Sequence, residues 1–247
     1  MIKYKKFQKI RLGVNIDHIA TLRQVRGDTT PYPNIHKFAI LAMKSGAEQI
    51  TIHLREDRRH IQLKDLIMLS KDKKVKINLE MAATDEMFEL ALKYKPAWVC
   101  LVPEKRQELT TEGGLNVSTV ESQLQKWIPR LHKKNIKVSL FIAPQAEMIE
   151  LTKTLNADAV EFHTGHWVSE VSKIKKQKFW KELYNGAILA NELKLNVHAG
   201  HGLDYEHAAI IKTLPYLQEL NIGHSLICYS IELGIKKAIQ KMCQILK

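Results

Sequence analysis

Cysteine is scarce in this chain, which has three cysteines among 247 residues, Cys100, Cys228 and Cys243. They are too few and too widely spaced for a disulfide framework, and none belongs to the Cys-x-x-Cys pair of a metal clip. Scattered thiols of this kind fit a reducing compartment. We therefore expect a cytoplasmic protein.

Long hydrophobic runs are also missing. No stretch approaches the roughly 20 apolar residues that cross a membrane. Residues 1–9 are basic, but no apolar segment follows them, so they do not read as a signal peptide. We expect no membrane partner, and we expect residues 1–10 to form a short basic extension.

Linkers rich in glycine, proline or serine are absent, and no sequence repeat exceeds one strand plus one helix. With 45% hydrophobic and 26% charged residues, the chain can bury a sizeable core. These features predict a single domain over residues 1–247.

Acidic residues are the minority charge: 38 Lys and Arg face 26 Asp and Glu, a net charge of +12. Such an excess raises nucleic-acid binding as a rival function. However, the lysines spread over every predicted helix without interleaved aromatic residues, as in residues 133–134, 173–178 and 236–237. We expect a solvated surface and no nucleic-acid partner, and the charge would steer small phosphorylated substrates.

Short apolar runs of strand length alternate with longer amphipathic segments along almost the whole chain. The predicted strands are residues 12–16, 49–54, 76–80, 98–102, 137–142, 159–163, 195–199 and 219–222. Eight such units in about 250 residues predict a (β/α)8 TIM barrel, an α/β fold. The alternative is a doubly wound open sheet, but no Gly-x-Gly-x-x-Gly follows the first strand as a dinucleotide site would need.

Two segments give further local signals. Thr84, followed by Asp85 and Glu86, is typical of a helix N-cap with acids in the first turn. A single apolar stripe, with spacings of three and four, predicts a last helix over residues 227–245.

Two loops are longer than a barrel needs, residues 23–33 and 104–116. Loops of this length in a compact domain usually carry function. The second ends in Gly113-Gly114, which could act as a hinge. We expect residues 104–116 to form a lid over the site.

Polar residues stand where six of the eight strands should still be apolar. Because the carboxyl ends of parallel barrel strands share one face, we expect these side chains to meet there. They are Asn15, Asp17 and His18; His53 and Arg55; Asn78 and Glu80; Glu161 and His163; His198 and His201; and Asn221 and His224.

His53, Glu80 and His201 are the candidate acids and bases. Burial and neighbouring charges can move imidazole and carboxylate pKa values toward neutrality, which proton transfer requires. A simpler account of Glu80 is a salt bridge to Arg55, and one residue could serve both purposes.

Anion binding is predicted at two places. The arginine forks of residues 26, 55, 58 and 59 suit phosphate, although Arg59 is better explained by a surface pair with Glu56 or Asp57. The turn at Gly223 opens the last helix, and barrels often bind phosphate there. The two sites suggest two phosphate esters as substrates.

A metal site is the main alternative, because His163 with His166, and His198 with His201, share loops. The first strand lacks the His-x-His that many metal-dependent barrels carry. We expect no metal and no organic cofactor. A metal-dependent barrel aldolase or hydrolase, and an RNA-binding barrel, remain the rival functions.

Long motifs in order resemble the pyridoxine 5'-phosphate synthase family. They are GVNIDHIATLRQVRG (13–27), ITIHLREDRRHI (50–61), NLEMAAT (78–84), LVPEKRQELTTEGGL (101–115), VSLFI (138–142), HTG (163–165), AGHGL (199–203) and ELNIGHSLI (219–227). The resemblance spans nearly the whole chain.

The resemblance implies a (β/α)8 barrel that joins 1-deoxy-D-xylulose 5-phosphate to 3-amino-2-oxopropyl phosphate without a metal or cofactor, releasing phosphate and water. It implies that His53 and Glu80 accept protons and that His201 donates one. The residues expected to hold the sugar phosphate are Asp17, His18, Arg55, His60 and Thr110. Those expected to hold the amino ketone phosphate are Asn15, Arg26, Gly202, Gly223 and His224.

The family also implies a large homo-oligomer, commonly an octamer. Three departures from the family pattern concern the amino ketone phosphate side. Cys228-Tyr229 replaces a small residue followed by arginine, His198 replaces asparagine, and residues 28–30 lie in a slightly longer first loop. Residues 56–59 are expected to form a charged shell around the binding residues.

Overall fold

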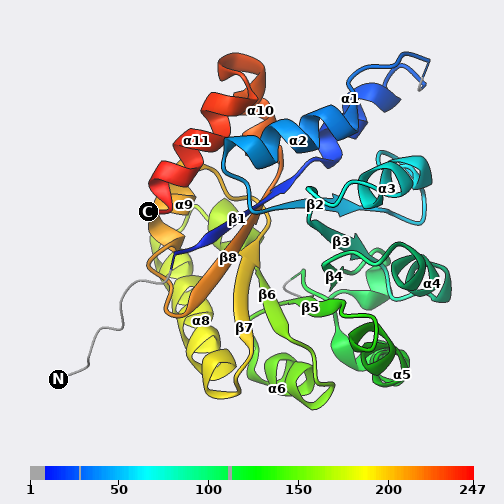
Figure 1. Ribbon diagram of the computed structural model, residues 1–247. Helices are drawn as coiled ribbons and strands as arrows, with labels where there is room; N and C mark the ends of the chain where they lie inside the picture. The colour runs from blue at the N-terminus through cyan, green and yellow to red at the C-terminus, as the bar shows by residue number, and fades with distance from the viewer. Residues whose placement is uncertain (1–8, 28, 111–112) are drawn as a thin grey trace.

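The computed structural model describes residues 9–27, 29–110 and 113–247 (Figure 1). Eight parallel strands form a closed barrel in chain order, with β8 paired to β1. The strands are β1 (Arg11–Asn15), β2 (Gln49–His53), β3 (Ile77–Met81), β4 (Trp98–Leu101), β5 (Lys137–Ile142), β6 (Ala159–His163), β7 (Asn196–Gly200) and β8 (Leu217–Ile222). The predicted barrel is confirmed, with strand limits shifted by at most two residues, and the open-sheet alternative is wrong.

Three expectations fall partly outside the described residues. They concern the basic extension, of which only residues 9 and 10 are described, residue 28 of the first loop, and residues 111–112 of the expected lid.

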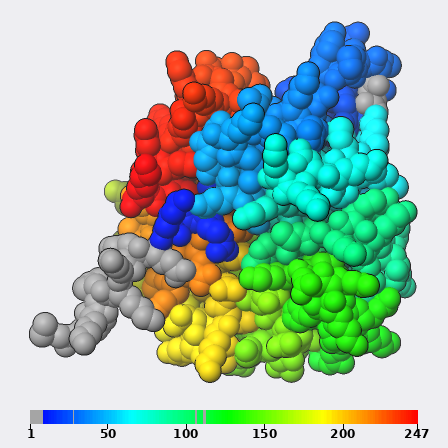
Figure 2. All heavy atoms as spheres, in the orientation of Figure 1, coloured from blue at the N-terminus to red at the C-terminus, as the bar shows by residue number. Residues whose placement is uncertain are grey.

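Helices surround the barrel, and the space-filling view shows them covering most of the strands (Figure 2). They are α1 (Asp17–Gln24), α2 (Ile35–Ser45), α3 (Leu63–Ser70), α4 (Asp85–Tyr94), α5 (Glu121–His132), α6 (Ala146–Thr154), α7 (Gly165–Ser169), α8 (Lys173–Glu192), α9 (Tyr205–Ile211), α10 (His224–Leu233) and α11 (Ile235–Ile245), with short 3-10 turns η1 (Arg106–Glu108) and η2 (Val117–Thr119). Within residues 9–27, 29–110 and 113–247, no helix is long and apolar enough to cross a membrane.

Each strand presents two different faces. Apolar side chains point outward and are buried against the helices, for example Ile50, Ile52, Leu79, Val99, Val160 and Phe162. The alternate positions point inward and are largely polar, for example Gln49, Thr51, Asn78, Glu161, Glu219 and Asn221, which are joined by hydrogen bonds across the barrel. Strands of parallel sheets are usually apolar on both faces. Here the inner face of the barrel is polar, and its upper part supplies side chains to the cavity described below.

Local signals explain where several helices begin and end. The Thr84 hydroxyl accepts a hydrogen bond from the Met87 N–H, which confirms the predicted N-cap of α4. The single last helix predicted over residues 227–245 is wrong. Gly234 has φ +77, so the chain breaks there into α10 and α11.

The C-terminal helices pack against the first ones. α11 contacts α2, and α10 contacts α1, so both ends of the fold lie side by side (Figures 1 and 2). This packing covers the seam at which β8 meets β1.

Candidate active site

A cavity of about 540 Å³ opens at the carboxyl ends of the strands. Ten of the thirteen predicted site residues line it, namely Asn15, Asp17, His18, His53, Arg55, Glu80, His201, Gly202, Gly223 and His224. The expectation that the polar strand ends meet at one face is confirmed for all of those residues except Asn78 and His198, which do not line the cavity.

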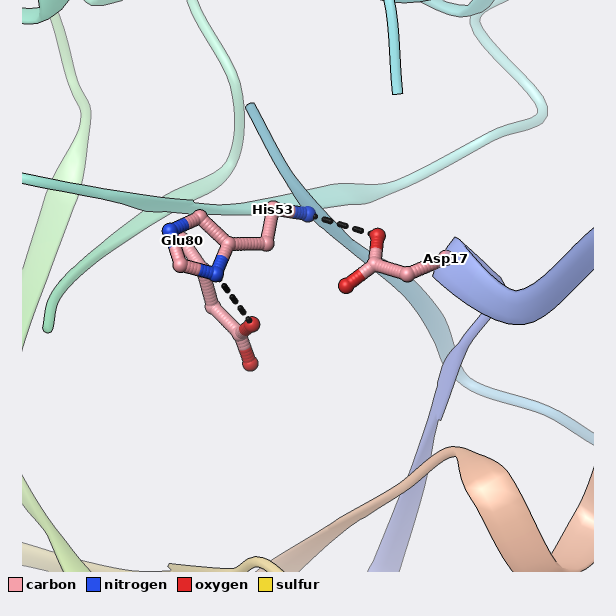
Figure 3. Close-up of side chains that lie close together, drawn as sticks. All are labelled: Asp17, His53 and Glu80. Carbon is pink, nitrogen blue, oxygen red and sulfur yellow. Dashed lines mark hydrogen bonds and ion pairs between the residues drawn. The ribbon is translucent and has the colours of Figure 1, made fainter. Parts of the chain in front are cut away.

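Asp17, His53 and Glu80 form the centre of one wall (Figure 3). An Asp17 carboxylate oxygen accepts the His53 backbone N–H at 2.8 Å, and the other accepts the Asn15 side-chain amide at 2.8 Å. His53 Nδ1 lies 3.9 Å from Glu80 Oε2. The three side chains come from α1, β2 and β3, so barrel closure brings them together.

Glu104, at the start of the loop after β4, fixes the His53 ring. Its Oε1 lies 2.8 Å from His53 Nε2, and its Oε2 accepts the Glu56 backbone N–H at 3.0 Å. A carboxylate at Nε2 selects the tautomer that carries its proton there. Nδ1 is then left as the basic nitrogen facing Glu80.

The two buried carboxyl groups of this wall hold their protons more tightly than usual. Burial, together with the negative charges of Asp17 and Glu161, raises the pKa of Glu80 well above its usual range. Burial also raises the pKa of Asp17 to about 6, against the opposing effect of His53. A carboxyl group whose pKa is raised from its usual value can hold a proton for transfer at a pH where an exposed carboxyl group has lost it.

Arg55 lies at the rim rather than beside Glu80. Its guanidinium is 3.3 Å from Asp57 and 3.9 Å from Glu104. The suggested Arg55–Glu80 salt bridge is therefore wrong, because Glu80 turns inward toward His53. The preferred surface role of Arg59 is confirmed by its 2.6 Å pair with Asp57, and Arg58 pairs with Glu86.

Three predicted binding residues do not line the cavity. His60 is nearest, with its ring centre 6.2 Å from that of His53, and burial lowers its pKa to about 4. Thr110 lies in the loop after β4, between cavity-lining Leu109 and Gly113. Arg26 lies exposed beyond the end of α1, away from the cavity lining.

The opposite wall is made of backbone and histidine. Gly202 adopts φ +80, a left-handed conformation that suits glycine. Gly223 caps α10, and a Cβ there would lie only 3.0 Å from that of Asn15. His224 meets the His18 ring edge-on at 4.9 Å. The start of α10 thus offers backbone N–H groups to an anion.

His201 stacks on His163, with ring centres 4.8 Å apart. Burial lowers the pKa of His201, with a further contribution from His166, so it is neutral in the empty cavity. A Cβ at Gly165 would lie 2.7 Å from the His163 ring and 2.9 Å from that of His201. Glycine at 165 therefore allows the two imidazoles to stack.

Glu161 forms the floor of the cavity together with Asn221. Burial raises the pKa of Glu161 to about 8, so the carboxyl group is protonated at neutral pH. Both residues were recognised as polar strand ends, but neither was predicted as a site residue.

His198 lies below this floor and not at the cavity. It is 1% exposed and packs edge-on against Trp98. β7 continues to Gly200, so His198 stands inside the strand instead of at its exit. We name Arg11, Gln49, His198 and Glu219, which are linked by short side-chain contacts, the basal layer.

The expected lid lies over one side of the mouth. Gly113 lines the cavity and has φ +85, as a hinge glycine could. Gly114 instead packs so tightly on the end of β5 that a Cβ would lie 2.3 Å from the Ala143 nitrogen. At Gly114 the close contact, rather than a free hinge, explains the glycine.

A metal could be held at one group within the described part of the chain, Asp17, His53 and Glu80, whose ligand atoms lie within 4.8 Å of one another. Both Asp17 oxygens are already hydrogen-bonded, so a metal would have to displace these partners. Among the described residues, neither histidine pair considered from the sequence belongs to such a group, and His198 is separated from His201 by its position in the basal layer.

The sequence reasoning missed Glu104, Phe141, Glu161 and His163 as parts of the site. Phe141 packs edge-on against His163 and lines the cavity. The sequence could have indicated Glu161 and His163, because they are polar residues at the end of β6. It could not have indicated Glu104, which meets His53 from a loop 51 positions away in the chain.

The departures near α10 have simple structural roles. Tyr229 stacks on Tyr205 with ring centres 4.2 Å apart. Cys228 is exposed, and its sulfur lies 3.7 Å from His224 Nε2. Neither side chain lines the cavity.

Solved structures share the fold at low sequence identity. A tryptophan synthase structure from M. tuberculosis has a TM-score of 0.64 with 11% identity, covering 97% of this chain and 93% of that one. A phosphoribosylanthranilate isomerase from Thermotoga maritima has a TM-score of 0.56 with 9% identity, covering 96% and 98%. These similarities show the barrel fold alone.

Sequence relatives are far more similar. The family model described as "Pyridoxal phosphate biosynthesis protein PdxJ" matches residues 12–247. Pyridoxine 5'-phosphate synthase from Bdellovibrio bacteriovorus is 57% identical, with 97% of this chain and 99% of that protein covered. The enzyme of the same name from Ehrlichia canis is 49% identical, with 96% and 97% covered. The chain therefore belongs to the pyridoxine 5'-phosphate synthase family and is an enzyme of vitamin B6 biosynthesis.

Proposed function

We propose that the enzyme condenses 1-deoxy-D-xylulose 5-phosphate with 3-amino-2-oxopropyl phosphate to form pyridoxine 5'-phosphate, inorganic phosphate and water. The observation that carries this proposal is one cavity with acid and base groups between two anion-binding walls. Two phosphate esters need two such walls, and a condensation between them needs proton transfer rather than redox chemistry.

The sugar phosphate would lie on the Arg55 side. A guanidinium fork binds phosphate through charge-assisted hydrogen bonds. Asp17, His18, His60 and Thr110 would complete this half. His60 lies in the loop after β2 and Thr110 in the loop after β4, and both would meet the ligand when these loops adjust. His60 Nδ1 accepts the Ile61 N–H at 2.8 Å, which leaves Nε2 as the donor toward an anion.

The amino ketone phosphate would lie on the α10 side. Backbone N–H groups at Gly202 and Gly223 and the His224 ring would hold its phosphate, and Asn15 would hold its polar groups. Arg26 is assigned to this half by family resemblance and lies outside the cavity lining.

Proton transfer would be divided among the buried groups. His53 Nδ1, with its tautomer fixed by Glu104, is a base facing the substrates. The raised pKa of Glu80 makes its ionised form a strong carboxylate base, able to take a proton as the amine attacks the ketone. The protonated Glu161 would supply a proton to a leaving oxygen atom, and His201 would supply another once the negative charge of a bound phosphate favours its imidazolium form. No metal or organic cofactor is needed for these steps.

A homo-oligomer in the cytoplasm completes the proposal, with an octamer implied by family resemblance. Exposed apolar side chains at the C-cap of α1 and on α10 support self-association, since Val25 is 77% exposed and Ile231 73%. Light scattering coupled to size exclusion would measure the mass, and a stable monomer would contradict the assembly.

The most direct experiment mixes the protein with both phosphates. We expect phosphate release together with the absorbance of a pyridine ring, and neither when one substrate is omitted. Phosphate release without the ring would overturn the proposed condensation.

A further inference from the structure

The floor of the cavity is tied to the basal layer by a single amide. Asn221 Nδ2 lies 2.7 Å from Glu161 Oε2 and 3.3 Å from Glu219 Oε1. One side chain therefore donates to a carboxyl group that lines the cavity and to another that is buried beneath it.

The orientation of this amide is fixed from a third side. The Thr51 hydroxyl donates to Asn221 Oδ1 at 2.9 Å, and Asn78 Nδ2 approaches the same hydroxyl at 3.5 Å. Because Asn78 supplies a donor to Thr51, the hydroxyl proton is directed to Asn221. The Asn221 amide N–H groups are then left for the two carboxyl groups.

Glu219 meets donors on every side. Arg11 Nε lies 2.9 Å from one oxygen, and Gln49 Nε2 lies 2.5 Å from the other, which Asn221 also reaches. Burial raises the pKa of Glu219, but Arg11 opposes this effect. A carboxyl group that only accepts hydrogen bonds, one of them from a guanidinium, is ionised.

Glu161 has the opposite environment. Its described hydrogen bonds all reach Oε2, and Oε1 lies where a Cβ on Gly200 would approach to 2.5 Å. Glycine at 200 therefore leaves room for this oxygen at the floor. Burial and the negative charge of Glu219 raise the pKa of Glu161 to about 8, and the hydrogen bonds from Asn221 and Cys100 oppose this effect only in part.

The other titratable groups around Glu161 add little charge. Burial raises the pKa values of Cys100 on β4 and of Glu80 on β3 well above their usual ranges, which disfavours a negative charge on either side chain. Burial lowers the pKa values of His198 and His163 to about 3 and also lowers that of His201, so all three are neutral. Lys137 is the first residue of β5, and its ammonium group lies over the Trp98 ring at the amino-terminal end of the barrel, opposite the cavity.

We propose that Glu219 is a positioning residue for catalysis: its buried negative charge keeps Glu161 protonated, and its hydrogen bond orients Asn221, which holds Glu161 Oε2 so that Oε1 faces the substrates. This role rests on the proposed function, in which Glu161 gives a proton to a leaving oxygen. Glu219 touches no substrate and acts entirely from below the floor.

The test uses the full-length protein and two readouts. Infrared spectra between pH 5 and 9 follow the carbonyl band of protonated Glu161, identified by its loss in Glu161→Gln. In Glu219→Gln we expect this band to disappear about one pH unit lower than in the unsubstituted protein.

The second readout is kinetic. The decline of kcat on the alkaline side of its pH profile should move by the same amount, with KM for both phosphates changed less than about twofold. Glu89→Gln, which removes an exposed charge paired with Arg130, is the matched control and should shift neither.

The outcomes separate this inference from the proposed function. An unchanged Glu161 band in Glu219→Gln overturns the inference, as does a uniform loss of kcat at every pH, which a merely structural role would give. If Glu219→Gln does not fold, the unsubstituted protein still decides, because a Glu161 band lost near pH 5 contradicts the inference. A shifted band in a protein that forms no pyridine ring supports the inference and rejects the proposed function.

Discussion

The upper and basal parts of the barrel interior contain the same kinds of residue but use them differently. Both have histidine, glutamate and arginine on inward-facing strand positions or just beyond them. In the basal layer, Arg11 and Gln49 each donate a hydrogen bond directly to Glu219. At the cavity, His53 Nδ1 stands 3.9 Å from Glu80, beyond hydrogen-bond distance.

The difference shows that polar type alone does not identify a site. Buried polar groups that satisfy one another stabilise the barrel, whereas groups held firmly by one atom and facing a cavity with another are available for chemistry. Glu161 lies between the two parts, bound below and open above. Each of the following predictions tests this distinction.

The largest effect is expected at the cavity wall. His53→Asn and Glu80→Gln should fold normally and lower kcat at least about 100-fold, because each removes a group that transfers protons. Steady-state kinetics with both phosphates measures the loss. His36→Asn, which breaks a partly exposed pair with Asp72, is the control and should keep normal turnover. Near-normal rates in either cavity variant would mean that this wall is structural, like the basal layer.

Arg55→Ala should raise KM for the sugar phosphate about 10- to 100-fold, since a charge-assisted hydrogen bond contributes about 1.5 to 3 kcal/mol. The KM for the amino ketone phosphate should change much less. Arg59→Ala removes an arginine of the same segment that is paired at the surface, and we expect no change in either KM. If Arg55→Ala loses thermal stability but keeps its KM values, Arg55 stabilises the fold and does not bind the sugar phosphate.

Glu161 should make stability depend on pH. Its pKa is about 8 in the folded chain, above the usual 4.5, so the unfolded chain loses this proton first as pH rises. The stabilisation is complete below about pH 4.5 and declines up to about pH 8, by at most ~1.4 kcal/mol per pH unit.

Glu161→Gln should remove this decline and become more stable than the unsubstituted protein at pH 8. Urea unfolding at pH 6 and pH 8 measures both. Identical pH dependence in the two proteins would show that Glu161 is ionised when folded, which would remove the contrast between the floor and the basal layer.

The smallest expected effect is that of chelation. Both Asp17 oxygens and His53 Nε2 already have protein partners, so we expect dialysis against EDTA to leave kcat unchanged. Loss of activity that Zn²⁺ or Mg²⁺ restores would show that the Asp17, His53 and Glu80 group binds a metal instead of acting alone.

Much of the fold was predictable, because the spacing of apolar residues indicates the alternation of strands and helices. The cavity residues were predictable for a related reason: parallel strands end together, so polar residues after Ile16, Ile52 and Ile222 must meet. Contacts between distant loops were not. The bond from Glu104 to His53 depends on the path of the β4 loop, which periodicity does not specify.

The sequence also did not predict how deep in the barrel each polar side chain lies. His198 and His201 lie three residues apart and were expected together, but β7 ends between them at Gly200. A shift of two residues in a strand limit changes a side chain from the cavity to the basal layer. Similarly, Gly114 was read as a hinge because glycine is flexible, whereas its close contact with Ala143 depends on the packed structure.

The pairing of β8 with β1 also bears on synthesis. β1 is synthesised first, but one of its edges stays unpaired until residues 217–222 of β8 have been synthesised. Until then the growing sheet has two free edges and an unfilled polar interior, which favours pairing with other chains. The helices α10 and α11, which follow β8 and pack on α1 and α2, then hold the completed seam in place.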